Sequence, residues 1–261
     1  MLLVSWNVAG RKTRLAEQAE RVLELGPDVV CLQEVTPATA AAWVERLGEA
    51  GLSSELAPLP AAREGSRPLA VLTAARGPLA VVPVEDLPWA ERVLAARVDG
   101  IEVVNVHSPI SPKPGLAKVL THEAVSRHLR AGSGARVVLG DLNTPRKELP
   151  DGSVWTFARD RYGRLREDRG ERWDLAESAL VRGLEPAGFR DAFRELNGFD
   201  SKEPSWEWPR WGGGYRLDHL IASAEVAVSA CSYRHDWRRD DKLSDHSALV
   251  AELAVRPPAP R

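Results

Sequence analysis

Short apolar segments alternate along the chain with longer amphipathic ones. The short segments are rich in Val, Leu and Ile and are bounded by Gly, Pro, Asp or Asn, which is typical of buried sheet strands. This pattern predicts strands at residues 2–8, 28–34, 101–108, 136–143 and 215–223. Further apolar runs within 69–106 lack a helical segment between them and therefore predict paired strands.

Helices are predicted where apolar residues recur at intervals of three and four. Segment 13–25 places apolar side chains on one face, and a Gly-Pro pair follows it as a stop signal. The same reasoning predicts helices at 38–50, 115–131 and 174–187. Because helices separate some of the strands but not those of 69–106, we expect an α/β chain with a mixed sheet.

The predicted strands share one further feature, which is that each ends in polar side chains. One such ending carries little information, since every strand must leave the core. Repeated endings of this kind indicate a common site, because strand ends hold several side chains rigidly around one small volume. Unpaired buried carboxylates are costly and usually pair or bind a cation. The residues concerned are Asn7, Glu34, His107, Asp141, Asn143, Asp218, Asp245 and His246.

The strings that carry these residues are SWN, LQE, NVHS, GDLN, RLDH and SDH, in that order. This series resembles the endonuclease/exonuclease/phosphatase superfamily, which includes DNase I, exonuclease III-type abasic-site endonucleases, sphingomyelinases and inositol-polyphosphate phosphatases. The resemblance extends from residue 2 to about residue 255. It implies an α/β fold in which two mixed β-sheets pack face to face with helices outside, a DNase I-like four-layer sandwich.

Composition and termini narrow the class of protein further. We expect one domain over 1–255, because the candidate residues come from both ends of the chain, and a disordered tail at 256–261. A net charge of −2 argues against nonspecific coating of nucleic acid. The two cysteines suggest neither a disulfide framework nor a cysteine zinc site. With no signal-peptide pattern or membrane-length apolar run, we expect a cytoplasmic monomer.

The residue types suit hydrolysis of a phosphoester, which needs a cation on the anionic oxygens and a base for water. Glu34 and Asp245 are the predicted ligands of Mg²⁺, for which Mn²⁺ could substitute. Asp141 is the candidate group that orients or deprotonates water. Asn143, two residues on in an extended segment, would face the same side and donate to a phosphate oxygen. Asn7 would orient Glu34 or a metal-bound water.

A second group of residues predicts a positive charge opposite the metal. Asp218 beside His246 would favour the imidazolium and raise the pKa of the histidine, so that it can bind the scissile phosphate. By resemblance, His107 is a second phosphate donor. Abasic endonucleases usually carry tyrosine there, and DNase I-type enzymes pair this histidine with a glutamate, for which Glu64 is near the right region. The remaining histidines, at 122, 128, 219 and 235, are interpreted as structural or solvent-facing, with His235 in a charged loop.

Substrate contacts are expected in two places. Segment 205–215 crowds Trp206, Trp208, Trp211 and Tyr215 ahead of the RLDH string, and aromatic rings of this kind stack on nucleic-acid bases. We expect Trp206 to be core and the other three to bind substrate. Arg11, in the turn after the first strand, is placed to touch a backbone phosphate. The arginine-rich segment 159–172 favours a solvated charged face, with phosphate tracking as the alternative.

These observations predict a magnesium-dependent phosphodiesterase that hydrolyses the DNA backbone, as an endonuclease or exonuclease, with a role in repair left open. The alternative within enzymes is a phosphatase or phosphodiesterase acting on a small or lipid-linked phosphate. The alternative of another class is a catalytically silent binding module, which should have lost Glu34, Asp141 or His246. The two departures from the abasic endonucleases at the start of the site, Ala9 and Thr36 in place of an acid and a lysine, leave the subfamily undecided.

Overall fold

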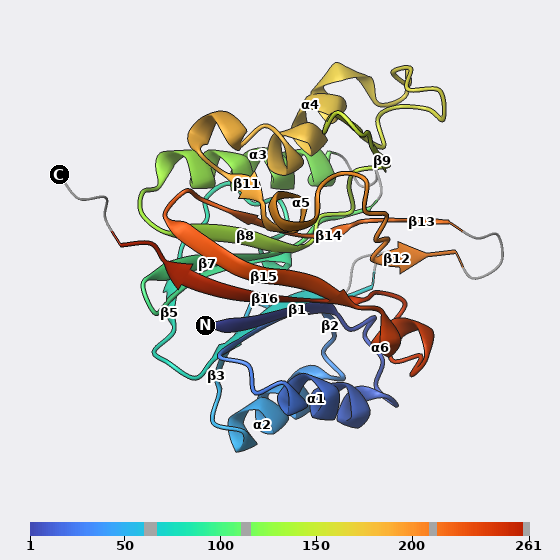
Figure 1. The fold of residues 1–261 in the computed structure, drawn as a ribbon. Helices are drawn as coiled ribbons and strands as arrows, with labels where there is room; N and C mark the ends of the chain where they lie inside the picture. Colours follow the sequence, from blue (N-terminus) through green and yellow to red (C-terminus); the bar gives the residue numbers. More distant parts are fainter. Residues whose placement is uncertain (60–66, 111–115, 209–212, 258–261) are drawn as a thin grey trace.

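The structure is a computed structural model that describes residues 1–59, 67–110, 116–208 and 213–257. It contains two six-stranded sheets (Figure 1). The first has the order β15 (Val226–Arg234), β16 (Ala248–Val255), β1 (Leu2–Asn7), β2 (Val29–Val35), β4 (Ala70–Ala75), β3 (Ser53–Leu56). The second has the order β11 (Arg190–Asp191), β14 (Asp218–Ala222), β8 (Arg136–Asp141), β7 (Ile101–His107), β6 (Val93–Val98), β5 (Ala80–Val82).

Both sheets are mixed, as expected. β1 runs parallel to β2 and β7 runs parallel to β8, whereas the other neighbouring strands are antiparallel. Helices α1 (Leu15–Glu24) and α2 (Ala40–Glu49) cover the outer face of the first sheet, and α3 (Ala117–Ala131) and α4 (Gly170–Val181) cover that of the second (Figure 1). The predicted four-layer α/β sandwich is therefore confirmed.

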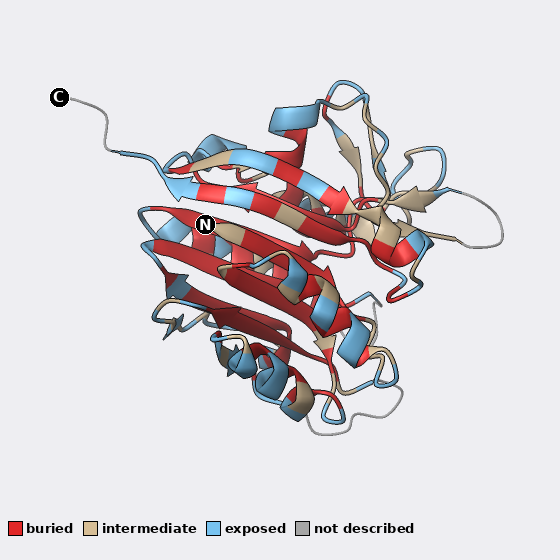
Figure 2. Cartoon of the chain, turned by 60° about the horizontal axis from the view of Figure 1, so that its bottom comes forward, coloured by how far each residue is buried: buried red, intermediate tan, exposed pale blue. Residues whose placement is uncertain are grey.

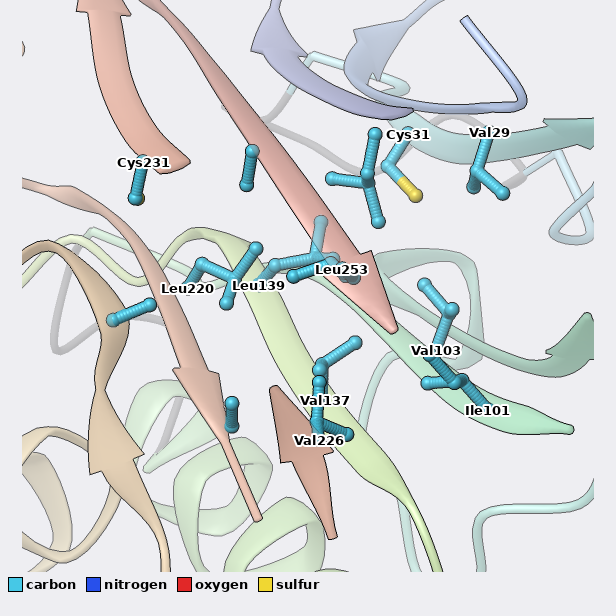
Figure 3. Close-up of a cluster of buried hydrophobic side chains, with 14 of the residues drawn as sticks. Val29, Cys31, Ile101, Val103, Val137, Leu139, Leu220, Val226, Cys231 and Leu253 are labelled. Atoms are coloured by element: carbon cyan, nitrogen blue, oxygen red, sulfur yellow. The ribbon is translucent and has the colours of Figure 1, made fainter. Parts of the chain in front are cut away.

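The core lies in three layers that the strand alternation produces. Leu3 faces the other sheet, whereas Val4 faces α1 and α2, so successive residues of β1 serve different layers. Figure 3 shows the cluster between the sheets, where Val29 and Cys31 of β2 oppose Val137 and Leu139 of β8. In Figure 2 the inner strands are almost wholly buried, whereas β15 and β16 carry exposed positions along their length, as do the outer helices and loops.

Toward one end of the sandwich, the space between the sheets changes from apolar to polar. Gln33 Nε2 donates to Ser5 Oγ at 3.2 Å and to Asn105 Oδ1 at 2.8 Å, and Asn105 Nδ2 donates to Leu72 O at 3.0 Å. These buried amides join the first sheet to the second. The next inward-facing positions beyond this polar layer are the strand ends that carry the candidate site.

Some predicted boundaries need correction. The strand predicted at 136–143 ends at Asp141, because Asn143 has a φ of +50° and leaves the extended conformation. The strand predicted at 215–223 begins at Asp218, since Tyr215 pairs instead with a short separate strand. The helix predicted at 174–187 is α4, shifted to 170–181 and followed by a 3₁₀ turn at Glu185–Ala187. The other predicted helices lie within about two residues of α1, α2 and α3.

Smaller elements complete the fold around this polar end. They are the hairpins β9 (Lys147–Glu148) with β10 (Val154–Trp155) and β12 (Trp206–Glu207) with β13 (Gly214–Tyr215), the helices α5 (Ala192–Asn197) and α6 (His235–Arg239), and the 3₁₀ turn Ala90–Arg92. No helix in the described part of the chain is long and apolar enough to cross a membrane. The last four residues of the predicted tail lie outside the described residues.

Candidate active site

The candidate residues meet where the inner strands end. In the second sheet, Asp141 of β8 is paired with His107 of the parallel strand β7 and with Asp218 of the antiparallel strand β14. The end of one strand and the start of its antiparallel neighbour lie at the same edge, so three candidate side chains share one level of the sheet. The first sheet supplies Asn7 and Glu34 from β1 and β2. The close grouping predicted from the strand endings is thus present.

Asn7 joins the two sheets at this level. Its Nδ2 donates to Glu34 Oε1 at 3.3 Å and to Asp141 Oδ2 at 3.0 Å. Its own orientation is fixed, since Oδ1 accepts from the backbone N–H of Ala9 at 3.0 Å and its backbone carbonyl accepts from Ser244 Oγ at 2.6 Å. The expected contact between Asn7 and Glu34 is present, and the contact with Asp141 adds to it.

Backbone strain gathers at this edge. Of the six non-glycine residues with positive φ in the described chain, three adjoin the site: Ala9, Glu34 and Asn143, with φ of 56°, 60° and 50°. Positive φ is costly for such residues and persists where the surroundings impose it, commonly at functional sites. At Glu34 the pairing of β2 with β4 also shifts register between Leu32 and Val35. Such a bulge redirects a side chain out of the strand alternation, which places Glu34 beside Asn7.

Asp141 occupies the centre of the site. Its Oδ1 accepts from the backbone N–H of Asn143 at 2.9 Å, and its Oδ2 lies 3.8 Å from His246 Nε2 and 3.9 Å from His107 Nε2. Burial raises the pKa of this carboxyl and the neighbouring Asp218 raises it further, while His246, Asn143 and Asn7 oppose the shift, giving a pKa of about 7. A divalent cation nearby would lower that pKa and favour the carboxylate.

His246 is held as a cation by a buried carboxylate. Its Nδ1 lies 2.8 Å from Asp218 Oδ2, and both side chains are almost fully buried. Burial alone would lower the pKa of His246, but the charges of Asp218, Asp141 and Asp245 outweigh it and raise the pKa to about 10. The predicted contact between Asp218 and His246 is present, and the raised pKa has the predicted direction.

His107 has the opposite environment. Arg92 Nη1 lies 2.5 Å from His107 Nδ1 and 3.4 Å from Nε2, and Arg92 is also buried. A guanidinium only donates, so the shorter contact favours Nδ1 as the acceptor and the ring hydrogen on Nε2, which faces Glu34 Oε1 at 3.8 Å and Asp141 Oδ2 at 3.9 Å. Burial, then Arg92, His246 and Arg67, hold the pKa of His107 well below 6.5. The predicted glutamate partner, Glu64, lies outside the described residues.

Asn143 does not have the extended geometry expected of it. Its left-handed backbone turns the side chain so that Nδ2 donates to Ser108 O at 2.8 Å, and its carbonyl accepts from Lys118 Nζ at 2.7 Å. Lys118 also pairs with Glu177 Oε1 at 2.7 Å, and both charges are fully buried. Its role as a phosphate donor stays a prediction. The sequence analysis missed the ion pair between Lys118 and Glu177, because a lysine within an amphipathic helix is expected to be solvated.

The carboxylates fit a divalent cation. Oxygen ligands suit Mg²⁺ and Mn²⁺, and the buried Oδ1 of Asp218 has no hydrogen-bond partner among the described residues. Ligand atoms of Asp141, Asp218 and His246 all lie within 4.8 Å of one another. This set differs from the predicted pair of Glu34 and Asp245, whose role as ligands stays a prediction. Asp245 is exposed, and its Oδ2 accepts from Trp206 Nε1 at 3.3 Å.

The aromatic residues form a cluster beside Asp245 and His246. Trp208 makes edge contacts with Trp206 and Tyr215, at centroid separations of 5.2 and 4.7 Å. Trp206, predicted to be core, is only half-buried, because the β12–β13 hairpin stands apart from the two sheets (Figure 1). Trp211 lies outside the described residues. The expected aromatic surface is therefore present in part of the predicted segment.

Two arginines, Arg11 and Arg67, differ in what they contact near this edge. Arg11 Nη1 donates to Lys242 O at 2.9 Å, so its described contact is with the loop before the SDH string. Arg67 instead reaches Glu34, with Nη1 3.3 Å from Oε2. Arg67 was missed because nothing in the sequence around it marks a strand end. The binding of phosphate by Arg11 stays a prediction.

The residues interpreted as structural have structural partners. Buried His219 contacts Asp191 Oδ2 at 3.2 Å and Thr144 O at 2.8 Å, and buried His122 contacts Ser108 Oγ at 2.8 Å. His128 pairs with Glu102. His235 begins α6 and does not lie in a loop as predicted. In segment 159–172, Arg159, Arg164, Arg166 and Arg172 each pair with a carboxylate, which favours the solvated charged face.

The chain belongs to the endonuclease/exonuclease/phosphatase family, whose model matches residues 4–246. The fold is also found in an AP endonuclease from Archaeoglobus fulgidus, with a TM-score of 0.73, 20% identity and coverage of 98% of this chain and 100% of that one. The 3′ phosphatase NExo from Neisseria, bound to a product DNA hairpin, matches with a TM-score of 0.69, 20% identity and coverage of 97% and 99%. A humanized D. rerio TDP2 matches at 0.66, 16% identity and coverage of 98% and 99%.

Proposed function

We propose that this protein is a divalent-metal-dependent phosphodiesterase that hydrolyses the DNA backbone. The observation that carries the proposal is the hydrogen-bonded arrangement in which Asn7 holds both Glu34 and Asp141 while Asp218 holds His246. It combines carboxylates, which suit a cation, with an imidazolium, which suits a phosphate. A silent binding module would have no need to keep buried carboxylates and a strained Glu34 at one edge.

The residues divide the reaction between them. Glu34 and Asp245 would hold Mg²⁺ or Mn²⁺, which supplies a Lewis acid that neutralises the phosphate. Asp141, fixed through Oδ1 by the Asn143 N–H, has Oδ2 directed into the site to orient or accept a proton from water. His246, kept protonated by Asp218, binds the phosphate and stabilises charge that develops on it. His107 adds a neutral N–H donor from the other side.

The choice of DNA rests on the surroundings of the site. The half-buried rings of Trp206, Trp208 and Tyr215 adjoin Asp245 and His246, where a nucleotide next to the scissile bond could stack. Among the structures that share the fold, one is an AP endonuclease and another carries a DNA hairpin as product. The overall charge of −2 favours local contacts at this end of the molecule over coating of a duplex.

A phosphatase acting on a small or lipid-linked phosphate is the second candidate. The observation that favours it is the depth of the central groups, since Asp141, Asp218 and His246 are at most 6% exposed. A terminal phosphate enters such a site more easily than an uninterrupted duplex. DNA with a free end or an unstacked nucleotide satisfies both observations, which is why a DNA substrate is retained.

One set of incubations tests the proposal. The protein is combined with supercoiled plasmid, duplex with one abasic site, single strands, a 3′-phosphorylated duplex and p-nitrophenyl phosphate esters, each with Mg²⁺, Mn²⁺ or EDTA. We expect metal-dependent cleavage of at least one DNA and none in EDTA. Full turnover in EDTA would remove the metal mechanism. Turnover of small esters without DNA binding at low salt would establish the phosphatase in place of the nuclease.

A further inference from the structure

A guanidinium lies at the open side of the site in contact with a candidate metal ligand. Arg67 Nη1 is 3.3 Å from Glu34 Oε2, and its Nη2 donates to Ala9 O at 3.2 Å. The side chain of Arg67 is 59% exposed, whereas that of Glu34 is 15% exposed. The arginine therefore lies at the boundary between the buried carboxylate and solvent.

The local backbone is shaped to accept this side chain. Gly10 has a φ of +58°, and a Cβ atom there would lie only 2.6 Å from Arg67 Nη2 and 2.8 Å from Thr36 Cγ2. The guanidinium thus packs against Gly10 in the turn after β1, where a larger residue would force the arginine side chain to shift. Ala9 and Glu34, which it contacts, are two of the residues with positive φ at the site. One side chain engages both strained turns of the first sheet.

Arg67 is exposed, whereas Asn7, which also contacts Glu34, is buried. A solvent-exposed ion pair between Arg67 and Glu34 contributes little to folding, so stability alone does not account for the position of Arg67. Its charge does act within the site, because it helps to lower the pKa of His107. A planar guanidinium that is 59% exposed beside the site is suited in charge and shape to the oxygens of a phosphodiester.

We propose that Arg67 is a substrate-positioning residue, which orients Glu34 and binds a phosphate oxygen of the DNA strand as it enters the site. This inference rests on the proposed function for the identity of the strand. It predicts two effects of opposite sign. Removing the positive charge beside Glu34 should strengthen binding of a divalent cation, and removing the guanidinium should weaken binding of DNA.

The test compares Arg67→Ala and Arg67→Lys with a matched control. Arg46→Ala removes an arginine that is also exposed, at 53%, and also pairs with one glutamate at 3.4 Å, but on the outer helix α2. For Arg67→Ala we expect Mn²⁺ to bind about threefold tighter in calorimetry of the DNA-free protein, by loss of a screened like charge. We expect KM for DNA to rise by about tenfold with a smaller change in kcat, and the salt slope of binding to fall by about one unit.

The remaining variants separate positioning from fold. Arg67→Lys should restore Mn²⁺ affinity to the wild-type value and recover only part of the DNA affinity, since an ammonium keeps the charge but not the planar guanidinium. Arg46→Ala should match wild type in every measurement. Wild-type Mn²⁺ affinity, KM and salt slope in Arg67→Ala would overturn the inference about Arg67 and leave the proposed function intact. If wild type itself fails to bind DNA at low salt, the proposed function falls, and the Mn²⁺ titration alone decides whether Arg67 acts on Glu34.

Discussion

Two histidines on opposite sides of Asp141 show how neighbours decide what one side chain can do. His107 and His246 are both buried, at 2% and 6% exposure, and their Nε2 atoms lie 3.9 and 3.8 Å from Asp141 Oδ2. The group on the far nitrogen differs, however. Arg92 contacts Nδ1 of His107, and Asp218 contacts Nδ1 of His246. The pKa of the first is therefore lowered and that of the second is raised.

The difference gives the site one cation and one neutral donor where two identical side chains would give two cations. Two imidazolium groups this close to Arg92 and a divalent ion would repel both the metal and each other. With only His246 charged, positive charge is placed on the side of Asp218, and Glu34 and Asp141 stay available to a metal. The charge of each histidine is thus set by the residue that contacts its Nδ1.

The largest expected effect comes from replacing each of the two histidines in turn by glutamine. His246→Gln removes a cation, whereas His107→Gln replaces one neutral N–H donor with another. We expect kcat/KM for DNA to fall by roughly 10²-fold or more in His246→Gln, as for other electrostatic groups, and by about tenfold or less in His107→Gln. Steady-state kinetics with Mg²⁺ and thermal melting of each variant provide the measurement. Equal losses would show that the two histidines are not distinguished by charge.

The next effect tests the carboxylate behind His246. Asp218→Asn keeps the shape but removes the charge that keeps the imidazole protonated, so we expect a loss of about 10²-fold in kcat/KM. The pKa of His246 should fall from about 10, followed by NMR of the ring protons in EDTA. A variant with unchanged histidine titration would remove Asp218 from this role.

Much of this arrangement was predictable from the chain. The strand endings SWN, LQE, NVHS, GDLN, RLDH and SDH identified side chains that meet in the structure, because alternation fixes which residues face the space between the sheets. The sandwich followed from the resemblance of the same strings to a known family. This resemblance rests on the order of the strings along the sequence and needs no knowledge of which residues are in contact.

The errors and omissions have a common physical cause, which is that local conformation departs from the strand pattern where the site is built. Asn143 was expected in an extended segment, but its positive φ turns it toward Ser108. Glu34 faces the site through a bulge that alternation cannot foresee. Arg92, Arg67 and Lys118 come from a turn, a loop and a helix, and only the tertiary structure brings their charges to the site.

The pH dependence of stability should sharpen the comparison. The folded pKa of His246 lies above its unfolded value of 6.5, so its stabilisation is complete below pH 6.5 and is lost as pH rises toward 10. The folded pKa of His107 lies below 6.5, so its contribution is present above pH 6.5 and is lost as pH falls. We expect urea unfolding in EDTA to show a smaller alkaline loss in His246→Gln than in wild type and in His107→Gln, with a remainder from groups such as Asp141 whose pKa is also raised. An alkaline loss in His246→Gln as large as that of wild type would contradict the assignment.

The smallest expected effect concerns Arg92, which acts on the reaction only through His107. Arg92→Met removes the donor to Nδ1, so the ring can place its hydrogen on either nitrogen and its pKa should rise toward 6.5. We expect kcat/KM to fall by about three- to tenfold, because an Nε2–H donor remains accessible to part of the population. Nitrogen chemical shifts of the His107 ring report the tautomer directly.

Arg97→Met, which changes an exposed arginine in β6, is the control for fold and should match wild type. If Arg92→Met leaves the ring in its Nε2–H form with unchanged kinetics, the tautomer is set by the strand ends alone, and the contrast between the two histidines would not depend on their charged partners.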